Sequence, residues 1–409
     1  MRVKKRRLYK LLMFDVIALA IIFVAVVCIR LDISFEVQNH KADQTELLFT
    51  QTLMKSTESL SKERLSPSVG DFINKDLLVD DELPSQEDVV EENTTVLEQV
   101  HMSIAGDVLF STSPLNKYDS GNGITSILSV DLLDTMNSSD ITMVNLEFPF
   151  STRGVQMEDK QYTFKADPSR GPILKEMGVD IVSLANNHTL DFGTEALLDT
   201  ITTLRENNIL SVGAGEDLEA AKKPSVSTIK GRNIAFLGAS RVIPVTDWNA
   251  TKYSPGVFTT YDPTLLIEEI KLAKQSNDLV IVYVHWGIEK EEYPEEYQRT
   301  MAKQYIDAGA DLVLGSHPHV LQGIEFYNGK PIVYSLGNFV FGHTIERTVL
   351  LDVTIDEQNL CNIRLIPCET KDAYTHTITS DDKVQEFYSY YEGISYGIKI
   401  DKYGNVIKE

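Results

Sequence analysis

Short apolar runs that end in polar residues recur along this chain after Val100. The pattern occurs in VHMSIAGDVLF, DITMVNLEFPF, VDIVSLANNHTLDFG, NIAFLGAS, LVIVYVHWG and DLVLGSHPH. The runs are rich in Val, Ile and Leu without strict alternation, which is typical of strands buried on both faces of a sheet. The third run leads into TEALLDTITTLRENN, which has the periodicity of a helix between parallel strands. The sequence therefore predicts an α/β fold.

The pattern changes after Gly342. The segments RTVLLDVTID, NIRLIPCET and ISYGIKIDKYGNVIKE predict strands joined by turns, the last with Tyr-Gly-Asn at its bend. Cys361 and Cys368 fall in one of these segments. In an extended strand their spacing turns them to opposite faces, so they cannot bridge each other.

The start of the chain has a different composition. MRVKKRRLYK is followed by LLMFDVIALAIIFVAVVCIR, in which Asp15 is the only charge between Leu11 and Ile29. About 20 apolar residues suffice for a membrane-spanning helix, and basic residues before it favour a cytoplasmic N-terminus. We therefore predict a basic cytoplasmic end over 1–10, a single-pass anchor in the cell membrane over 11–30, and an extracellular position for the rest.

Other interpretations of residues 11–30 remain open. A cleaved signal peptide would have a shorter apolar stretch and an A-x-A-like site, which is absent here. Cys28 suggests a lipoprotein, but Val27 stands where a small residue is expected. A buried core helix fits neither the length nor the basic flank.

Residues 31–98 are polar and increasingly acidic, as in DLLVDDELPSQEDVVEENTT. Such a composition buries too little apolar surface to offset the ordering entropy, so we predict a disordered linker. The folded domain is then expected over 99–409. The whole chain has 60 acidic and 38 basic side chains and a formal charge of -22, which argues against nucleic acid as a partner.

Polar side chains suited to metal binding stand at the ends of the apolar runs. In an open α/β sheet, ligands bind beyond the carboxyl ends of the strands, so these residues can converge. Carboxylate, amide and imidazole groups without thiolates suit two divalent ions such as manganese, iron or zinc, with one carboxylate bridging them. The residues are Asp107, Asn145, Glu147, Asn186, Asn187, His188, His285, His317 and His319.

Two local details bear on this prediction. Pro318 favours an extended conformation at His317, which would turn His317 and His319 to the same side. Each element alone also has an ordinary structural interpretation, such as a turn at Asp107 or a hydrogen-bonded core histidine at His285. The metal site is predicted from their joint occurrence at successive strand ends.

The stretches VHWGIEKEEYPEEYQ, GADLVLGSHPHVLQGIE and YSLGNFVFG, with AGDV, NLE and NNH upstream, resemble the CapA proteins of poly-γ-glutamate capsule synthesis. The resemblance covers about Val100 to Gly342 and extends to the plan of a short cytoplasmic end, one anchor and an external domain. CapA-type domains are in turn similar to the calcineurin-like metallophosphoesterases. That likeness implies a four-layer α/β/β/α sandwich.

The likeness to metallophosphoesterases also implies roles for individual residues. Asp107, Glu147 and His319 would hold one ion. The second ion would be held by Glu147, Asn187, His285 and His317. The resemblance further implies that His188 gives a proton or hydrogen bond to the leaving group and that Asp191 orients it.

The sequence departs from the metallophosphoesterase pattern at two points. The family's first element is Asp-x-His, whereas Asp107 is followed by Val108 and Leu109, so the first ion lacks a ligand. Glu147 stands in place of a bridging aspartate. Beyond the ligand set, further candidates for a substrate cleft or for support of the ligands are Asn145, Lys165, Glu289 and Asn338.

Two classes of function remain open. The first is a cell-surface metal-dependent hydrolase that cleaves a phosphoester or amide in an envelope polymer, which the presence of His188 favours. The second is a binding or export subunit that engages an anionic envelope polymer such as poly-γ-glutamate beside membrane-bound synthase subunits. The missing histidine of the first element favours the second class.

Overall fold

The computed structural model describes residues 98–409. The predicted anchor at 11–30 and nearly all of the predicted linker at 31–98 lie outside this part of the chain. Within residues 98–409, none of the helices has the length and apolar character needed to cross a membrane.

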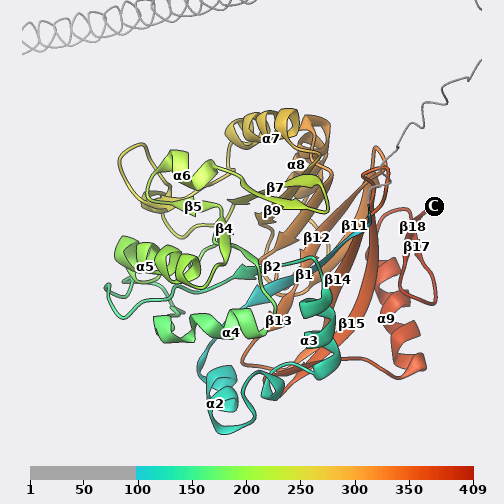
Figure 1. Cartoon of the computed structure of the whole chain (residues 1–409), viewed down its shortest axis with the longest axis horizontal. Coiled ribbons are helices and arrows are strands. Elements are labelled where there is room, and N and C mark those ends of the chain that lie inside the picture. The colour runs from blue at the N-terminus through green and yellow to red at the C-terminus, as the bar shows by residue number, and fades with distance from the viewer. Residues whose placement is uncertain (1–97) are drawn as a thin grey trace, which may run out of the picture. The chain divides into compact units, whose positions relative to one another are not determined.

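Two sheets form the centre of the fold (Figure 1). The eight-stranded sheet has the order β16-β15-β14-β1-β2-β3-β4, with β13 paired to β1. Its strands are β1 (Val100–Val108), β2 (Ile141–Leu146), β3 (Ile181–Ser183), β4 (Leu210–Val212), β13 (Asn338–Val340), β14 (Ile345–Ile355), β15 (Cys361–Lys371) and β16 (Tyr374–Thr377).

The second sheet has six strands in the order β11-β12-β10-β9-β7-β6. These are β6 (Ser225–Ile229), β7 (Arg232–Ser240), β9 (Leu279–His285), β10 (Leu312–Ser316), β11 (Leu321–Tyr327) and β12 (Lys330–Leu336). Two small pairs complete the strands: β5 (Ala214–Gly215) with β8 (Gly256–Val257), and β17 (Ile398–Ile400) with β18 (Val406–Lys408).

Helices connect and cover the strands. They are α2 (Thr112–Ser120), α3 (Val130–Ser138), α4 (Gly171–Glu176), α5 (Gly193–Glu206), α6 (Leu218–Lys222), α7 (Thr264–Ser276), α8 (Glu296–Ala308) and α9 (Asp381–Gly393), with 3-10 turns η1 (Gly123–Ser126), η2 (Pro168–Arg170) and η3 (Thr246–Trp248). In Figure 1, α7 and α8 lie on one side of the sheets, and α3 and α4 on the other.

The strands at the centre of each sheet run parallel: β1, β2, β3 and β4 in one, and β7, β9, β10 and β12 in the other. Antiparallel strands flank them. The apolar runs of the sequence form the central strands, which confirms the predicted α/β class. Their carboxyl ends therefore meet at shared edges, as a convergent site requires.

Three apolar clusters hold the layers together. In β9, Leu279 and Ile281 belong to the cluster between the two sheets, whereas Val280 and Val282 belong to the cluster under α7 and α8. Burial on both faces explains why the run does not alternate in polarity. Burying one such aliphatic side chain contributes roughly 1.5–3 kcal/mol, so the core between the sheets fixes their relative position.

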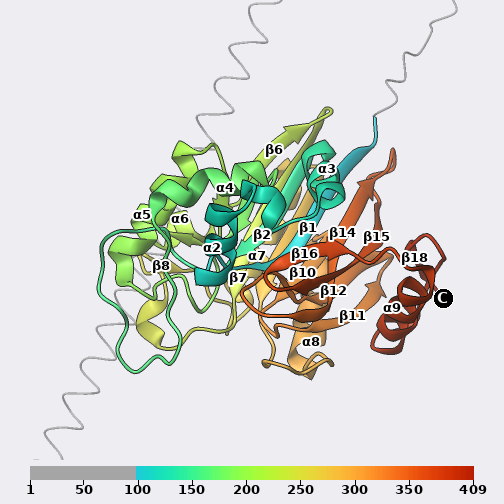
Figure 2. The same cartoon turned by 90° about the horizontal axis from the view of Figure 1, so that it is seen from below.

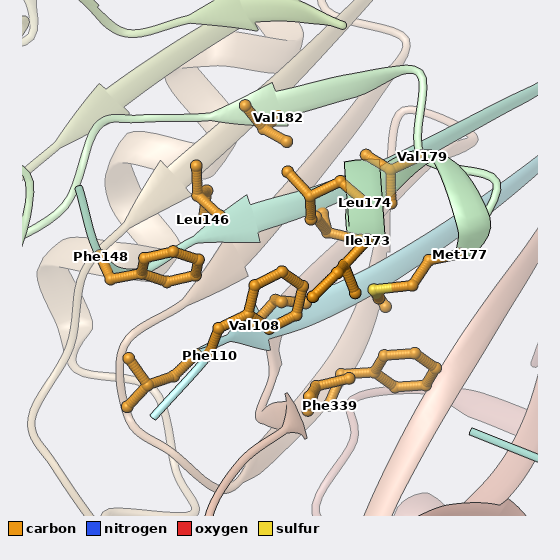
Figure 3. Close-up of a cluster of buried hydrophobic side chains, with 14 of the residues drawn as sticks. Val108, Phe110, Leu146, Phe148, Ile173, Leu174, Met177, Val179, Val182 and Phe339 are labelled. Atoms are coloured by element: carbon orange, nitrogen blue, oxygen red, sulfur yellow. The ribbon is translucent and has the colours of Figure 1, made fainter. Parts of the chain in front are cut away.

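The third cluster lies between the eight-stranded sheet and helices α3, α4 and α5. Figure 3 shows Ile173 and Leu174 of α4 packed over Val108 and Leu146, at the ends of β1 and β2. This packing holds the two strand ends that carry acidic residues. The layers therefore run helices, sheet, sheet, helices.

The C-terminal segments form strands as predicted. Cys361 faces the core between the sheets and Cys368 faces the helix side, and both are free. Helix α9 was not anticipated. In Figure 2 it lies near β11 and β18, at the end of the fold away from α5, and it contacts β11 and β17.

Candidate metal centre

The predicted metal ligands lie at the ends of strands from both sheets. Asp107 is in β1, and Glu147 directly follows β2. His285 is the last residue of β9, and His317 directly follows β10. Strand pairing sets Asp107 beside both Asn145 and Asn338, and sets His285 beside Ser316. The sheet register therefore brings residues distant in sequence to one place.

Glu147 occupies the centre of the cluster. Its side chain is 1% exposed, and neither carboxylate oxygen has a hydrogen-bond partner. Burial and the negative charge of Asp107 raise the pKa of Glu147 well above its ordinary value. A buried polar group without a partner costs about 1–3 kcal/mol, and a charged one more. A cation between the two carboxylates would remove this cost, so this residue fits a metal.

One ring nitrogen of His285 faces the cluster, and the other contacts a neighbouring hydroxyl group. Its Nε2 lies 2.8 Å from Asn187 Oδ1, 3.7 Å from Glu147 Oε1 and 3.1 Å from His317 Nδ1. Its Nδ1 lies 3.0 Å from the Ser316 hydroxyl. A histidine that binds metal commonly has its second nitrogen fixed in this way.

The imidazoles of His285, at the end of β9, and of His317, in the turn after β10, are in the form that binds metal. Burial lowers the pKa of His317 to about 3 and lowers the pKa of His285 well below its ordinary value. Both rings are therefore neutral at physiological pH, and neutral imidazole is the ligand form.

His319 differs from the other two histidines. Its Nδ1 lies 3.4 Å from Asp107 Oδ2, 3.9 Å from Glu147 Oε2 and 2.7 Å from Asn338 Oδ1. Burial lowers the pKa of His319, but the carboxylates of Glu147 and Asp107 outweigh it and raise that pKa to about 10. In the metal-free protein, a proton on this ring supplies the positive charge that the carboxylates attract.

Two overlapping groups have ligand atoms within 4.8 Å of one another: Asp107, Glu147 and His285, and Glu147, His317 and His319. Both groups share Glu147, as expected of a bridging ligand. These groups place His285 with Asp107 and His317 with His319, whereas the family-based assignment places His285 with His317 and His319 with Asp107. The observed contacts of His319 with Asp107 and of His285 with His317 follow the family-based assignment. The donor types and burial fit divalent ions.

The expectation that Pro318 keeps His317 extended is wrong. The φ angle is +101° at His317 and +59° at His319, in the region that residues other than glycine rarely adopt. The backbone N–H of His317 donates to Asp107 Oδ2 at 3.4 Å, so a contact with the other sheet accompanies the turn. Tertiary contacts outweigh the local preference, and such strain is often retained at functional sites.

The predicted pair His188 and Asp191 is in contact beside the cluster. His188 Nδ1 lies 2.8 Å from Asp191 Oδ2, and burial lowers the pKa of His188. A neutral ring that donates its Nδ1–H to Asp191 leaves Nε2 free. This arrangement can orient an imidazole for proton transfer.

Lys160 joins this pair and was missed from the sequence. Its ammonium donates to Asp191 and to the Asn187 carbonyl, and lies 3.1 Å from His188 Nδ1. No motif marks Lys160, because it stands in a long segment with little regular structure between β2 and α4. Ser316 was also missed, although its position directly before His317 was a usable signal.

The remaining candidate residues differ in their burial and in their position relative to the cleft. Asn145 Nδ2 donates to Asp107 Oδ1 at 2.8 Å, which positions that carboxylate. Glu289 is exposed at the rim of the cleft. Lys165 is not among the residues that line the cleft; its ammonium donates to the Arg153 carbonyl at 3.0 Å and lies over the Phe192 ring.

A cleft opens over the cluster. One cavity of about 480 Å³ is lined by His188, His319 and the aromatic residues Tyr162, Phe164 and Phe341. A second cavity of about 300 Å³ shares His319, Lys290 and His343 with the first. The two cavities therefore border each other along one side of the site.

Comparisons with known proteins match the part of the chain that contains the candidate centre. The model of the family described as bacterial capsule synthesis protein PGA_cap matches residues 101–343. The PGA biosynthesis protein CapA of Bacillus subtilis is 33% identical over 289 residues, which cover 69% of this chain and 75% of that protein. The capsule biosynthesis protein CapA of Bacillus anthracis is 31% identical over 296 residues, which cover 69% of this chain and 70% of that protein.

Solved structures match more weakly. The sulfate thiohydrolase SoxB of Thermus thermophilus matches with a TM-score of 0.38 and 14% identity, covering 76% of this chain and 61% of that one. A TM-score this low does not establish a shared fold.

Proposed function

Because the chain belongs to the bacterial capsule synthesis protein family PGA_cap, we propose that it is an accessory protein of poly-γ-glutamate capsule synthesis. It engages the polymer in the cleft lined by His188 and His319. One observation carries the proposal: carboxylate, amide and imidazole donors from two sheets converge on a buried carboxylate that has no hydrogen-bond partner. With divalent ions bound, such a centre would offer an anionic polymer local positive charge on a chain whose formal charge is -22.

The proposal includes a place in the cell. The apolar stretch over 11–30 and its basic flank support a single-pass anchor with the folded domain outside. There the domain would meet the polymer as membrane-bound synthase or export subunits deliver it. The linker over 31–98 would let the domain reach roughly 45 Å from the membrane, on the scaling for flexible chains.

We further propose that the cluster is a dinuclear centre of the metallophosphoesterase type. The four layers and the donor types support this assignment. Glu147 would be shared by manganese, iron or zinc ions, with Asp107 and His319 on one side and His285 and His317 on the other. When bound, such ions supply Lewis acidity toward water and toward a substrate oxygen.

The chain's own residues would orient the substrate and move a proton. Asp191 and Lys160 hold the Nδ1 side of His188, so a proton would be taken up or released at Nε2. Phe164 and Phe341 line the cleft and would exclude water from the reacting groups.

The shape of the cleft supports an extended ligand. The two adjoining cavities share Lys290, whose backbone N–H donates to the Pro318 carbonyl at 2.8 Å. This bond ties the loop after β9 to the turn after β10. A polymer lying along both cavities would pass the candidate ions and the Lys290 ammonium in turn.

A second candidate function is a cell-surface metal-dependent hydrolase that acts on a phosphoester or amide of another envelope component. The contact between His188 and Asp191 favours it, because a surface that only binds polymer has no need of an oriented proton carrier.

Elemental analysis of the purified full chain tests the metal centre. We expect about two transition-metal ions per chain, and their loss in the double variant His317→Ala, His319→Ala. The matched control His101→Ala, His376→Ala removes two histidines that are not in the cluster and should retain the metal. Absence of metal after reconstitution would contradict the proposed centre.

A polymer assay separates the two functions. The metal-loaded chain is incubated with poly-γ-glutamate, and binding and chain length are followed by size-exclusion chromatography. Binding without shortening supports the accessory role, and shortening that is lost in His188→Ala supports hydrolysis of this polymer. If the polymer is neither bound nor shortened, poly-γ-glutamate is not the ligand and the second candidate function takes precedence.

A further inference from the structure

The first of the two proposed ion positions lacks a ligand. The sequence has no histidine two residues after Asp107, and the residues that follow are apolar. Val108 and Leu109 are buried in the cluster on the helix side of the sheet, so neither can supply a donor. The set formed by Asp107, Glu147 and His319 is therefore incomplete unless another residue contributes.

Asn338 stands next to that set. It is the first residue of β13 and is paired with Asp107 in the sheet register. Gly106 permits this approach, because a Cβ on Gly106 would lie 1.8 Å from the Gly337 carbonyl oxygen. The same Gly337 oxygen accepts the Asp107 backbone N–H at 2.9 Å. The absence of a side chain at Gly106 thus allows Asn338 to lie beside Asp107 in the sheet.

The side-chain amide of Asn338 is buried, and only one of its two polar atoms has a hydrogen-bond partner. Its side chain is 1% exposed, and its Nδ2 has no hydrogen-bond partner. Its backbone is fixed by the Thr348 hydroxyl, which donates to the Asn338 carbonyl at 2.5 Å. A buried amide with an unpaired end carries a free-energy cost that an ordinary turn residue would avoid.

The distances around His319 fit atoms that share one cation. Asn338 Oδ1, Asp107 Oδ2 and Glu147 Oε2 lie 2.7, 3.4 and 3.9 Å from His319 Nδ1. Ligand atoms bound about 2.0–2.1 Å from one ion lie roughly 3.0–3.5 Å apart. Small side-chain shifts would bring all four donors to one ion.

The other half of the cluster contains a matching pair. Asn187 Oδ1 lies 2.8 Å from His285 Nε2, as Asn338 Oδ1 lies 2.7 Å from His319 Nδ1. Asn187 is the amide ligand in the set proposed for the second ion. Each half of the cluster therefore pairs one amide oxygen with one imidazole nitrogen.

We propose that the side-chain oxygen of Asn338 is a direct ligand of the ion held by Asp107, Glu147 and His319, in place of the missing histidine. The inference rests on the proposed dinuclear centre and goes beyond it. It makes the first position richer in oxygen, with three oxygen donors and one nitrogen. Such a set favours manganese, whereas the second set, with two imidazoles, suits iron or zinc.

A rival role for Asn338 is to hold His319 by a hydrogen bond without touching the metal. A cysteine at this position distinguishes the two roles. Only a thiolate bound directly to cobalt produces an intense near-ultraviolet charge-transfer band, so the full-length Asn338→Cys variant is titrated with Co²⁺ and followed by absorption. Thr348→Cys is the matched control, because its thiol would replace the hydroxyl that bonds the backbone of Asn338. The wild-type chain controls for its native cysteines.

The band should appear in Asn338→Cys and be absent from the control and the wild type. Cobalt binding to Asn338→Cys without the band would overturn the inference and leave the proposed centre intact. Failure of the wild type to bind cobalt would instead overturn the proposed centre, so the two failures can be told apart.

A second pair of variants decides the question if Asn338→Cys does not fold. Asn338→Asp keeps an oxygen donor, and Asn338→Leu keeps the approximate volume without one. Manganese titration of the full chain should show one of two sites preserved in Asn338→Asp and weakened in Asn338→Leu by more than the roughly 10–100-fold that loss of a supporting hydrogen bond costs. Wild-type affinity at both sites in Asn338→Leu would contradict a ligand role.

Discussion

The eight-stranded sheet brings oxygen atoms to the candidate centre, and the six-stranded sheet brings nitrogen atoms. Glu147 follows β2 of the first sheet, whereas His285 ends β9 of the second and His317 and His319 follow its β10. Neither sheet holds a complete ligand set. The centre therefore depends on the apolar core between the sheets, which sets their separation.

The two sides also differ in how well their polar atoms are satisfied. On the imidazole side, the Ser316 hydroxyl and Asn187 Oδ1 contact the two nitrogens of His285. On the oxygen side, both carboxylate oxygens of Glu147 lack a partner and face the negative charge of Asp107. The imidazole side is thus organised without a cation, whereas the oxygen side carries an electrostatic cost that protonated His319 offsets in part and that a metal ion would remove.

Replacing Glu147 should give the largest effect. In Glu147→Gln, the shared ligand is lost and metal content should fall from about two ions per chain to background. Above the ordinary pKa of a glutamate, the metal-free variant should be more stable than the metal-free wild type by about 1–3 kcal/mol, because the fold raises the pKa of Glu147 and so disfavours its ionised form. Elemental analysis and urea unfolding measure the two effects.

Glu289→Gln is the control for this change, because it neutralises an exposed acid at the rim of the same cleft. It should keep both ions. Retention of both ions by Glu147→Gln would show that the two ions do not share this residue as a ligand.

Proton release should distinguish His319 from the other two histidines. The raised pKa values of His319 and Glu147 belong to one coupled pair, and the pair holds a proton at neutral pH. Metal binding must displace that proton, so affinity should rise by about tenfold per pH unit as pH increases toward 10. His317, with its pKa lowered to about 3, should add no such dependence.

Calorimetry in buffers of different ionisation enthalpy measures this release directly. About one proton per chain is expected at neutral pH, and His319→Asn should change that number because it removes one member of the coupled pair. The proposal places His319 at one metal position and His285 and His317 at the other. Equal pH dependence of the metal affinity at both positions would contradict this division.

The sequence predicts the position of a candidate ligand well where it is the last residue of an apolar strand or directly follows one. Glu147, His285 and His317 are of this kind, and the sheet register brings them together. Helix α9 could also have been predicted, because Phe387 and Tyr391 recur at helical spacing and are buried. That signal was present in the sequence and was not used.

Other features follow from tertiary contacts that no local pattern encodes. Lys160 reaches Asp191 only because the segment between β2 and α4 folds back over the cluster. The positive φ at His317 goes against the local effect of Pro318. The unpaired amide of Asn338 depends on the close approach of Gly337 to Gly106. Each of these is a relation between segments distant in sequence.

Replacing Ser316 should give the smallest effect and tests the claim that the imidazole side is organised in advance. In Ser316→Ala, His285 Nδ1 loses its 3.0 Å contact and retains Asn145 Nδ2 at 3.5 Å, so the ring is less firmly oriented. Affinity should fall by about tenfold at one metal position and stay unchanged at the other, as measured by metal titration. Ser240→Ala is the control: Ser240 flanks His285 from β7, but its hydroxyl donates to backbone carbonyls, of Val242 at 2.7 Å and of His285 at 3.5 Å, and not to the imidazole ring. Equal losses in the two variants would trace the effect to packing around β9, and the contrast between the two sides would then lie in the ligands alone.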